Sequence, residues 1–194
     1  MSQTMSRLQQ IEEKIDTPEF KENTGSANEV SYFIFDYDPK DELMVRDYVH
    51  DLVERVNQKT YLDYHISCFD LYDIMINYLK EEDILEDVFE MEEEGFEEVA
   101  LSIGDAMGIN TMDENYFIDY IKERIDENSV IFITGVGKIY PIVRAHKILN
   151  NLHLAIDNIP VVLFLPGTYS AQNISLFGLL NDNYYRAFKL IEGE

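Results

Sequence analysis

The sequence predicts an α/β fold, a single three-layer domain over residues 1–194 in which a mainly parallel sheet of about five strands lies between helices. Two observations carry this prediction. Short apolar segments rich in β-branched and aromatic residues alternate with longer segments that have apolar residues at helical spacing. The short segments are apolar on both faces, which is typical of parallel strands covered by helices on either side.

The chain is expected to begin with a helix, a loop and a strand. In residues 1–28, apolar residues at helical spacing predict a helix, and the polar stretch after it predicts a loop. Residues 30–35 (VSYFIF) have the composition of a strand. The next helix is expected to run to about Gln58, because Asp38 suits its cap and Pro39 suits its first position.

The remaining elements alternate as this fold class requires. Further strands are expected at 64–69, 130–134 and 161–165, with a last extended segment at 184–191. Helices are expected at 71–79, 116–125 and 141–152. The strands at 30–35, 64–69 and 130–134 are thus each followed by helical sequence, as in the crossover connections of a parallel sheet.

The middle of the chain contains an acidic segment, which we expect to be a helical insertion at 80–115. No Lys or Arg occurs between Lys80 and Lys122, yet apolar residues recur at helical spacing. The expected buried stripe consists of Ile84, Leu85, Val88, Phe89 and Met91. The outer face is either simply solvated or a docking surface for a basic partner. Its candidate docking residues are Glu92, Glu93 and Glu94.

Net charge restricts the kind of partner. The chain has 38 Asp and Glu against 15 Lys and Arg, a formal charge of -23 at pH 7. Binding to nucleic acids or anionic membranes depends on cations that meet phosphates, so neither is expected. No basic start precedes an apolar stretch, and no apolar run approaches about 20 residues. A cytoplasmic location is therefore expected.

The segment IFITGVGKIYPIVRAHK raises the question of a phosphate-binding loop. A nucleotide-binding P-loop requires G-x-x-x-x-G-K-[ST]. Counting back from Gly137 and Lys138, the first glycine of the motif falls on Phe132. Ile139 also replaces the hydroxyl residue that binds magnesium. The dinucleotide fingerprint fails as well, because no third glycine follows Gly135 at the required spacing.

Two interpretations of this glycine turn stay open. Gly135 and Gly137 permit positive φ or a close approach of strand and helix, which favours a purely structural turn. In the alternative, Lys138 and the N–H groups of the following helix bind a single carboxylate or phosphate. The sequence excludes triphosphate binding at this turn but does not distinguish between these two interpretations.

A second candidate site lies in FIFDYDPK, where Asp36 and Asp38 follow a strand. Two carboxylates at this spacing resemble those of haloacid-dehalogenase-type phosphotransferases, in which one attacks phosphate and the other handles the proton. Pro39 stands where that family has Thr or Val, and the later strand VVLFL ends without an acidic pair. A magnesium-dependent phosphate-processing enzyme using Asp36, Asp38 and Lys138 remains an alternative. In the competing interpretation Asp38 is a helix cap and Asp36 a polar strand end.

Histidine and cysteine give no metal or nucleophile site. His146 and His153 are two helical turns apart but have no third ligand nearby, so ordinary packing is expected. The single cysteine, Cys68, lies in the apolar stretch YHISCFDL and is expected to be a buried, inert thiol. We therefore expect no metal ion, no cofactor and no complete catalytic set.

The later segment FLPGTYSAQNISLFGLLNDNYYRAF is aromatic and rich in turn residues. Aromatic residues and arginine are enriched in protein interfaces, but aromatic residues also fill the closing strands of sheets. Both interpretations stay open. The candidate residues for a partner surface are Tyr169, Phe177, Tyr184, Tyr185 and Arg186.

Three segments resemble the BrxB proteins of BREX phage-resistance systems. They are FIFDYDPKDELMVRDYV, ITGVGKIYPIVRAHKILNNL and VVLFLPGTYSAQNISLFGLLNDNYYRAFKL. The resemblance covers most of the chain from residue 30 onward, except for the acidic segment. The family-signature positions of the turn and the following helix are Gly135, Gly137, Lys138, Tyr140, Pro141, Arg144, His146 and Asn150.

The resemblance implies a small component, without established catalysis, of a multi-protein bacterial defence apparatus. It further implies an adaptor role, with the alkaline-phosphatase-like PglZ protein as the expected direct partner. The residues are consistent with this adaptor role, since they offer acidic and aromatic surfaces but no complete active site. The expected function is a non-enzymatic adaptor. Its alternatives are the phosphate-processing enzyme described above and an acidic mimic of DNA.

Overall fold

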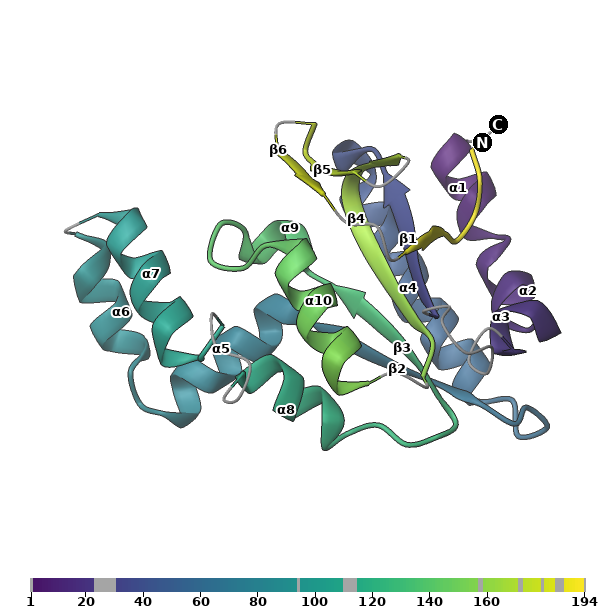
Figure 1. Cartoon of the computed structure of the whole chain (residues 1–194), viewed down its shortest axis with the longest axis horizontal. Coiled ribbons are helices and arrows are strands. Elements are labelled where there is room, and N and C mark those ends of the chain that lie inside the picture. Colours follow the sequence, from purple (N-terminus) through teal and green to yellow (C-terminus); the bar gives the residue numbers. More distant parts are fainter. Residues whose placement is uncertain are drawn as a thin grey trace.

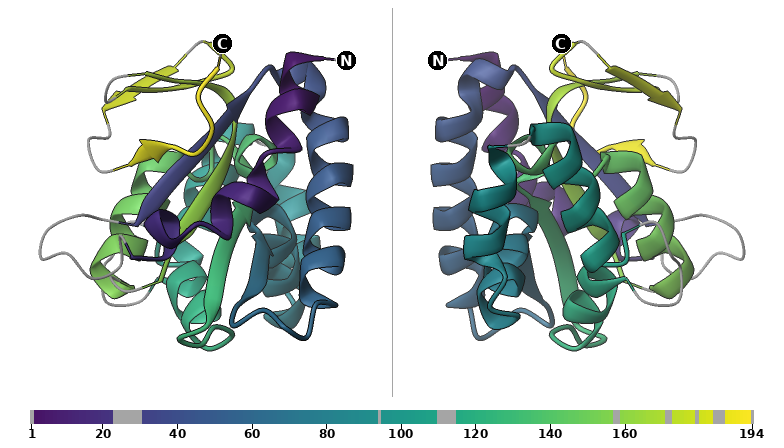
Figure 2. Two further views of the ribbon diagram at one scale, coloured as in Figure 1. Left: turned by 90° about the vertical axis from the view of Figure 1, so that its right-hand side faces the viewer. Right: turned by 90° about the vertical axis from the view of Figure 1, so that its left-hand side faces the viewer.

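Five parallel strands form the centre of the computed structural model, in the order β2-β3-β4-β1-β7. The structure describes residues 2–22, 31–93, 95–109, 115–156, 159–170, 173–178, 180–183 and 187–193. The strands are β1 (Tyr32–Tyr37), β2 (His65–Asp70), β3 (Ser129–Thr134), β4 (Val161–Ser170) and β7 (Phe188–Lys189). Helices cover both faces of the sheet (Figures 1 and 2). The predicted fold class is confirmed.

The first layer of helices comes from the N-terminal part of the chain. It contains α1 (Gln3–Leu8), α2 (Ile11–Ile15), α3 (Pro18–Glu22), the short 3-10 helix η1 (Pro39–Asp41) and α4 (Glu42–Asn57). Leu8, Ile11 and Ile15 are buried against one face of β1 and β4, together with α4. Asp38 caps η1 as predicted, with Pro39 at the first position. The strand expected at 30–35 begins at Tyr32 in the described residues and continues to Tyr37.

The second layer covers the opposite face and brings the glycine turn to the sheet. It contains α5 (Leu71–Glu81), α8 (Tyr116–Lys122), α9 (Val136–Ile139) and α10 (Ala145–Ala155). Gly135 has φ 76°, which ends β3 and starts the single turn of α9. The helix expected at 141–152 therefore begins only at Ala145, and Pro141 lies in the connection between α9 and α10.

Strand β4 is longer than the predicted 161–165 because it changes partners along its length. Its first half pairs in parallel with β1 and β3. Its second half pairs antiparallel with β5 (Asn173–Leu176), which in turn pairs with β6 (Leu180–Asn183). At Gly167 a Cβ would lie 2.0 Å from the carbonyl oxygen of Ser175, so only glycine fits where β5 crosses close to β4.

The acidic segment forms two helices rather than one. Helices α6 (Leu85–Glu92) and α7 (Phe96–Ala106) pack against each other, and Gly95 separates them with φ 141°. We call this pair the acidic hairpin; it projects at the left end of Figure 1, away from the sheet. Phe89, which the sequence places in the buried stripe, is 54% exposed. The stripe prediction is wrong for this residue because its side chain faces away from the packed side of α6.

The structure also corrects the prediction that the single cysteine is buried. Cys68 lies on β2, at the edge of the sheet, and its side chain is exposed rather than buried. Desolvation by the surrounding protein, followed by the charge of Asp70, raises the pKa of its thiol to about 11. The thiol therefore stays protonated at neutral pH, although part of it reaches solvent.

Candidate functional site

The carboxyl ends of the parallel strands meet at one edge of the sheet, which is where open α/β sheets bind their ligands. Asp36 lies near the end of β1, Asp70 ends β2, and Lys138 follows β3 on α9. These residues carry the charges from which a phosphate-binding or catalytic site would be built. The contacts of each one determine what this edge of the sheet is able to do.

Protein groups hold both carboxylate oxygens of the buried Asp36. Arg7 donates from Nη2 to Oδ1 at 2.7 Å. The backbone N–H of Tyr169 donates to Oδ2 at 2.9 Å, and Lys189 Nζ lies 3.1 Å from the same oxygen. Arg7 also donates to the carbonyl oxygens of Asp36 and Ile191, at 2.7 and 2.9 Å. Asp36 thus joins α1, β1, β4 and the C-terminal segment.

These partners keep Asp36 ionised and occupied. Burial raises the pKa of its carboxyl group, but the hydrogen bond from Tyr169 and those from Arg7 and Lys189 bring the pKa below its ordinary value. A carboxylate engaged through both oxygens is poorly placed to attack phosphate. The sequence gives no indication of Arg7, apart from its being one of few cations in an acidic chain.

The other members of the suggested catalytic set lie in separate contacts. Asp38 is exposed, and its carboxylate accepts a hydrogen bond from the N–H of Lys40 at 3.0 Å, as a cap of η1 does. Lys138 Nζ pairs with Asp70 Oδ2 at 2.5 Å and lies 3.9 Å from Asp73 Oδ1. No direct contact among the described residues joins Asp36, Asp38 and Lys138 into one site.

Asp70 supplies the carboxylate that Lys138 contacts beside the glycine turn. Its Oδ1 caps α5 by accepting from the backbone N–H groups of Tyr72 and Asp73. Its Oδ2 faces Lys138, and Thr134 Oγ1 lies 3.4 Å away. The sequence left open whether the turn is purely structural or whether Lys138 binds a single carboxylate or phosphate. In the structure a carboxylate of the chain itself lies there.

The two glycines of the turn are accounted for by packing. A Cβ at Gly135 would lie 2.3 Å from Asp70 Oδ1, and the positive φ there is a region that side chains rarely adopt. A Cβ at Gly137 would lie 2.9 Å from Pro166 Cγ and 3.0 Å from Phe177 Cζ. The structural interpretation of the turn therefore explains both residues without a ligand.

Several signature residues line a groove beside the acidic hairpin instead. The α7 groove, as we call it, has a volume of about 450 Å³ and lies between α7 and the connection from α9 to α10. Its lining residues are Glu97, Ala100, Leu101 and Gly104 on α7, and Tyr140, Pro141, Ile142, Arg144 and Lys147 opposite. Sequence reasoning named Tyr140, Pro141 and Arg144 from the family pattern but gave no sign that α7 faces them.

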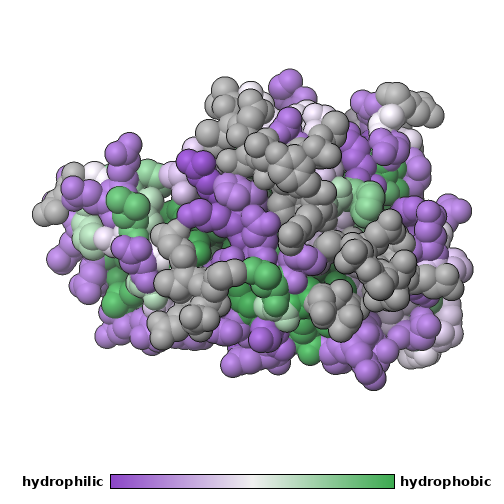
Figure 3. All heavy atoms as spheres, viewed as in Figure 1, coloured by the Kyte–Doolittle hydropathy of each residue, from purple (hydrophilic) through white to green (hydrophobic). Residues whose placement is uncertain are grey.

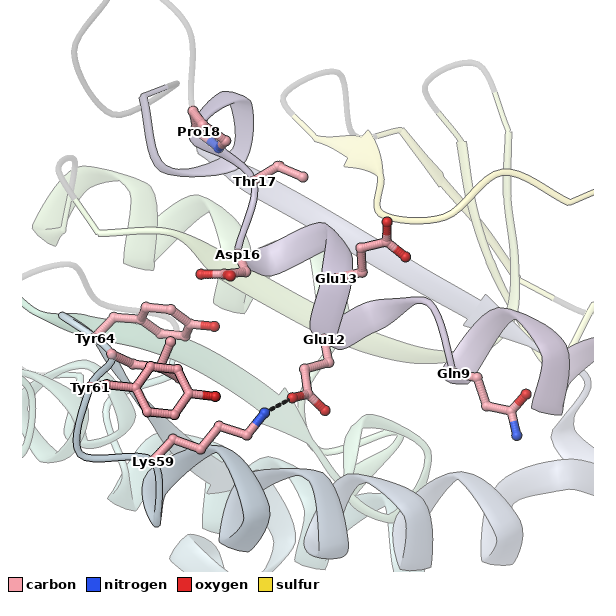
Figure 4. A pocket seen from close by; sticks show the side chains of 10 residues that line it. Gln9, Glu12, Glu13, Asp16, Thr17, Pro18, Lys59, Tyr61 and Tyr64 are labelled. Carbon is pink, nitrogen blue, oxygen red and sulfur yellow. Dashed lines mark hydrogen bonds and ion pairs between the residues drawn. The ribbon is translucent and has the colours of Figure 1, made fainter.

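A larger hollow, of about 590 Å³, lies among the N-terminal helices and the loop after α4 (Figure 4). Glu12 points across it and pairs with Lys59, while Arg55 Nη2 lies 2.9 Å from the other oxygen of Glu12. The hydrogen bond from Lys59, together with that from Arg55, lowers the pKa of Glu12. These ion pairs fasten α2 to α4 and to the loop after it, so a structural role accounts for Glu12 and Lys59.

The structure changes the set of aromatic residues that are able to form a partner surface. Tyr169 is only 4% exposed, and its hydroxyl donates to the carbonyl oxygen of Ala187, so it belongs to the core and not to a surface. Phe177 is partly exposed, and its ring contacts that of Tyr140 edge-on. Tyr184, Tyr185, Arg186, Glu94 and the side chain of Glu92 lie outside the described residues. Glu93 is exposed at the end of α6.

The remaining candidates are on α10. His146 is partly buried and Asn150 is exposed, while His153 packs edge-on against Tyr32. Within the part of the chain that the structure describes, no group of three or more His, Cys, Asp or Glu side chains is placed to hold a metal ion. None of the helices in these described ranges combines the length and the apolar character that a membrane span requires.

These features define a class: a three-layer, mainly parallel α/β domain whose strand ends are closed by internal ion pairs and which carries an acidic helical hairpin. A family model described as "BREX protein BrxB" matches residues 67–190. The chain is 42% identical over 193 residues to the BREX protein BrxB of Bacillus cereus (strain H3081.97), covering 99% of this chain and 100% of the relative. It therefore belongs to the BrxB family.

A second relative gives the same assignment. The chain is 31% identical over 189 residues to the BREX protein BrxB of Escherichia coli O9:H4 (strain HS), covering 95% of this chain and 90% of the relative. No solved structure matches the chain significantly. The resemblance that the three sequence segments predict is confirmed by these two relatives and by the family model.

Proposed function

We propose that this protein is a non-enzymatic adaptor, a component of a BREX system that binds another protein of that system. The observation that carries the proposal is the surface of the acidic hairpin. Phe89, Phe96 and Leu101 are exposed there, in a segment that contains no cation between Lys80 and Lys122. Figure 3 shows hydrophobic surface at this end of the molecule, interspersed with hydrophilic side chains. Exposed apolar groups gathered in this way are typical of protein interfaces.

The closed edge of the sheet supports the non-enzymatic part of the proposal. Asp36 is held by Arg7, Lys189 and Tyr169, and Lys138 is held by Asp70. The charges at the strand ends are thus used within the chain to fasten its own segments. This differs from a catalytic site, in which charged groups face a substrate.

The expected partner is the alkaline-phosphatase-like PglZ protein of the same system. Membership of the BrxB family supports a partner from the same BREX system, and the exposed apolar surface of the hairpin supports a protein as that partner. A net charge of -23 directs the protein toward a partner with a basic patch and away from direct contact with DNA, RNA or anionic lipid. A BREX component acting in this way works in the bacterial cytoplasm.

Co-purification tests the adaptor proposal. The tagged protein is expected to retain the purified PglZ-like protein at an ionic strength of about 0.1 M and to lose much of it at about 1 M, because the Debye length falls from roughly 10 to roughly 3 Å. Replacing Phe89 and Phe96 together by serine is expected to weaken binding at least about tenfold, as loss of interface anchors does. Calorimetric titration measures both effects.

Leu43→Ser is the matched control for that experiment. Leu43 is 62% exposed on α4, outside the hairpin, so its loss is expected to leave binding unchanged. Failure of the two folded proteins to associate at low salt contradicts the proposal. So does magnesium-dependent turnover of phosphoesters that Asp38→Asn abolishes, because Asp38 is exposed and serves the fold only as a cap.

A further inference from the structure

We propose that Asn57 blocks the open edge of β2, where its side chain takes the place of a neighbouring strand and prevents a second copy of this chain from pairing there. This inference does not depend on the adaptor function. Strand β2 lies at one end of the sheet order β2-β3-β4-β1-β7. Among the described strands it pairs only with β3, so the other side of this six-residue strand is an edge.

The backbone groups of β2 alternate between β3 and this edge. The N–H of His65 donates to the carbonyl oxygen of Asn128, directly before β3, at 3.0 Å. Successive residues of a strand direct their N–H and C=O groups to opposite sides, so those of Ile66 and Cys68 are directed to the open edge. Unpaired backbone groups in such a row are a site at which a strand of another molecule is able to pair.

Asn57, the last residue of α4, occupies part of this edge. Its Nδ2 donates to the carbonyl oxygen of Ile66 at 2.9 Å, and its Oδ1 accepts from the N–H of Ile66 at 2.8 Å. Two hydrogen bonds exchanged with a single residue are the pattern of a hydrogen-bonded pair in an antiparallel ladder. Both groups that Ile66 would offer to an added strand are therefore satisfied within the chain.

The two ends of the sheet are protected in different ways. At the far end, β7 has only two residues, and a very short edge strand pairs poorly with another chain. At the near end, helix α5 begins directly after β2, and Asn57 covers Ile66. Only residues 67–70 of β2 remain between these two barriers, which is a short stretch for stable strand pairing. Without Asn57 the open edge would extend over the whole strand.

The direct test is analytical ultracentrifugation at an ionic strength of about 0.5 M, where the repulsion between copies of net charge -23 is screened. Asn57→Ala removes both hydrogen bonds at an exposed position, and it is expected to raise the apparent mass at least about twofold relative to the unaltered chain. Asn57→Asp places a charge at the edge instead, so its apparent mass is expected to stay unchanged. Gln58→Ala, at the next exposed position, is the matched control.

A second substitution identifies the edge through which the copies pair. Cys68 is exposed on β2, and a lysine on an edge strand opposes strand pairing. Asn57→Ala combined with Cys68→Lys is therefore expected to return to the apparent mass of the unaltered chain. If Asn57→Ala lowers only the melting temperature, Asn57 is merely a tether between α4 and β2, and the inference is overturned. Self-association that Asn57→Asp shares, or that Cys68→Lys does not reverse, overturns it as well.

Discussion

Asp36→Asn is expected to lower the free energy of unfolding by about 2–4 kcal/mol. This is close to the loss that follows removal of one partner of a buried ion pair. The expected loss is somewhat smaller because Lys189 reaches solvent, which weakens its interaction with Asp36. The substitution keeps the size of the side chain, so no cavity forms. It leaves the cations of Arg7 and Lys189 without the carboxylate that they share. Chemical denaturation followed by circular dichroism measures the difference. Asp38→Asn, at the exposed cap, is the control and is expected to change stability little.

The ion pairs of Asp36 also predict how the stability of the protein depends on pH. The folded-state pKa of Asp36 is lowered, so its contribution to stability is complete above its unfolded pKa of about 4 and is lost as pH falls through the folded value. The gap in stability between the unaltered chain and Asp36→Asn is therefore expected to be constant near neutral pH and to narrow below about pH 4. A gap that stays constant in acid would show that the ion pairs do not stabilise this junction.

Gly135→Ala is expected to destabilise the protein by about 2–3 kcal/mol, the sum of a left-handed residue with a side chain and the displacement of Asp70. The added Cβ would lie 2.3 Å from Asp70 Oδ1, so the carboxylate has to leave its position against Lys138 and the first turn of α5. Thermal unfolding is expected to show a clearly lower melting temperature, with loss of the α5 cap.

The variant Gly178→Ala separates the effect of backbone strain from the effect of the clash with Asp70. Gly178 has φ 72°, close to that of Gly135, but a Cβ there would meet nothing within 4 Å. Only the backbone strain of about 1–2 kcal/mol is expected for Gly178→Ala. The double variant Gly135→Ala with Asp70→Ala is expected to lose less stability than the two single variants added together, because the clash is removed. Equal effects at Gly135 and Gly178 would remove Asp70 from the explanation.

Local sequence rules predict most of the fold. The strands with β-branched and aromatic residues lie where expected, and Asp38 with Pro39 starts the next helix. The antiparallel extension of β4 was missed because residues 166–183 are rich in turn-forming and polar residues, and their strand pairing depends on a distant partner. The break in the acidic segment was missed as well, although Gly95 is its signal.

The candidate site was less predictable because its contacts are long-range. Sequence spacing identified Asp36, Lys138 and the two glycines as unusual, but it gave no indication of Arg7, 29 residues from Asp36 along the chain. It also missed Asp70, whose position just before an apolar helix would have suggested a cap. The pairing of α7 with Tyr140 and Arg144 across the groove depends on tertiary packing alone.

The junction at Asp36 also has a consequence for how the molecule is handled and arranged. Arg7 binds both Asp36 and the carbonyl oxygen of Ile191, so helix α1 and the C-terminal segment are joined, at the end of the molecule opposite the acidic hairpin (Figure 1). A fluorescent protein or an affinity tag fused at either terminus would therefore point away from the hairpin. Distances measured between a label at a terminus and a bound protein would therefore show at which end of the molecule that protein binds.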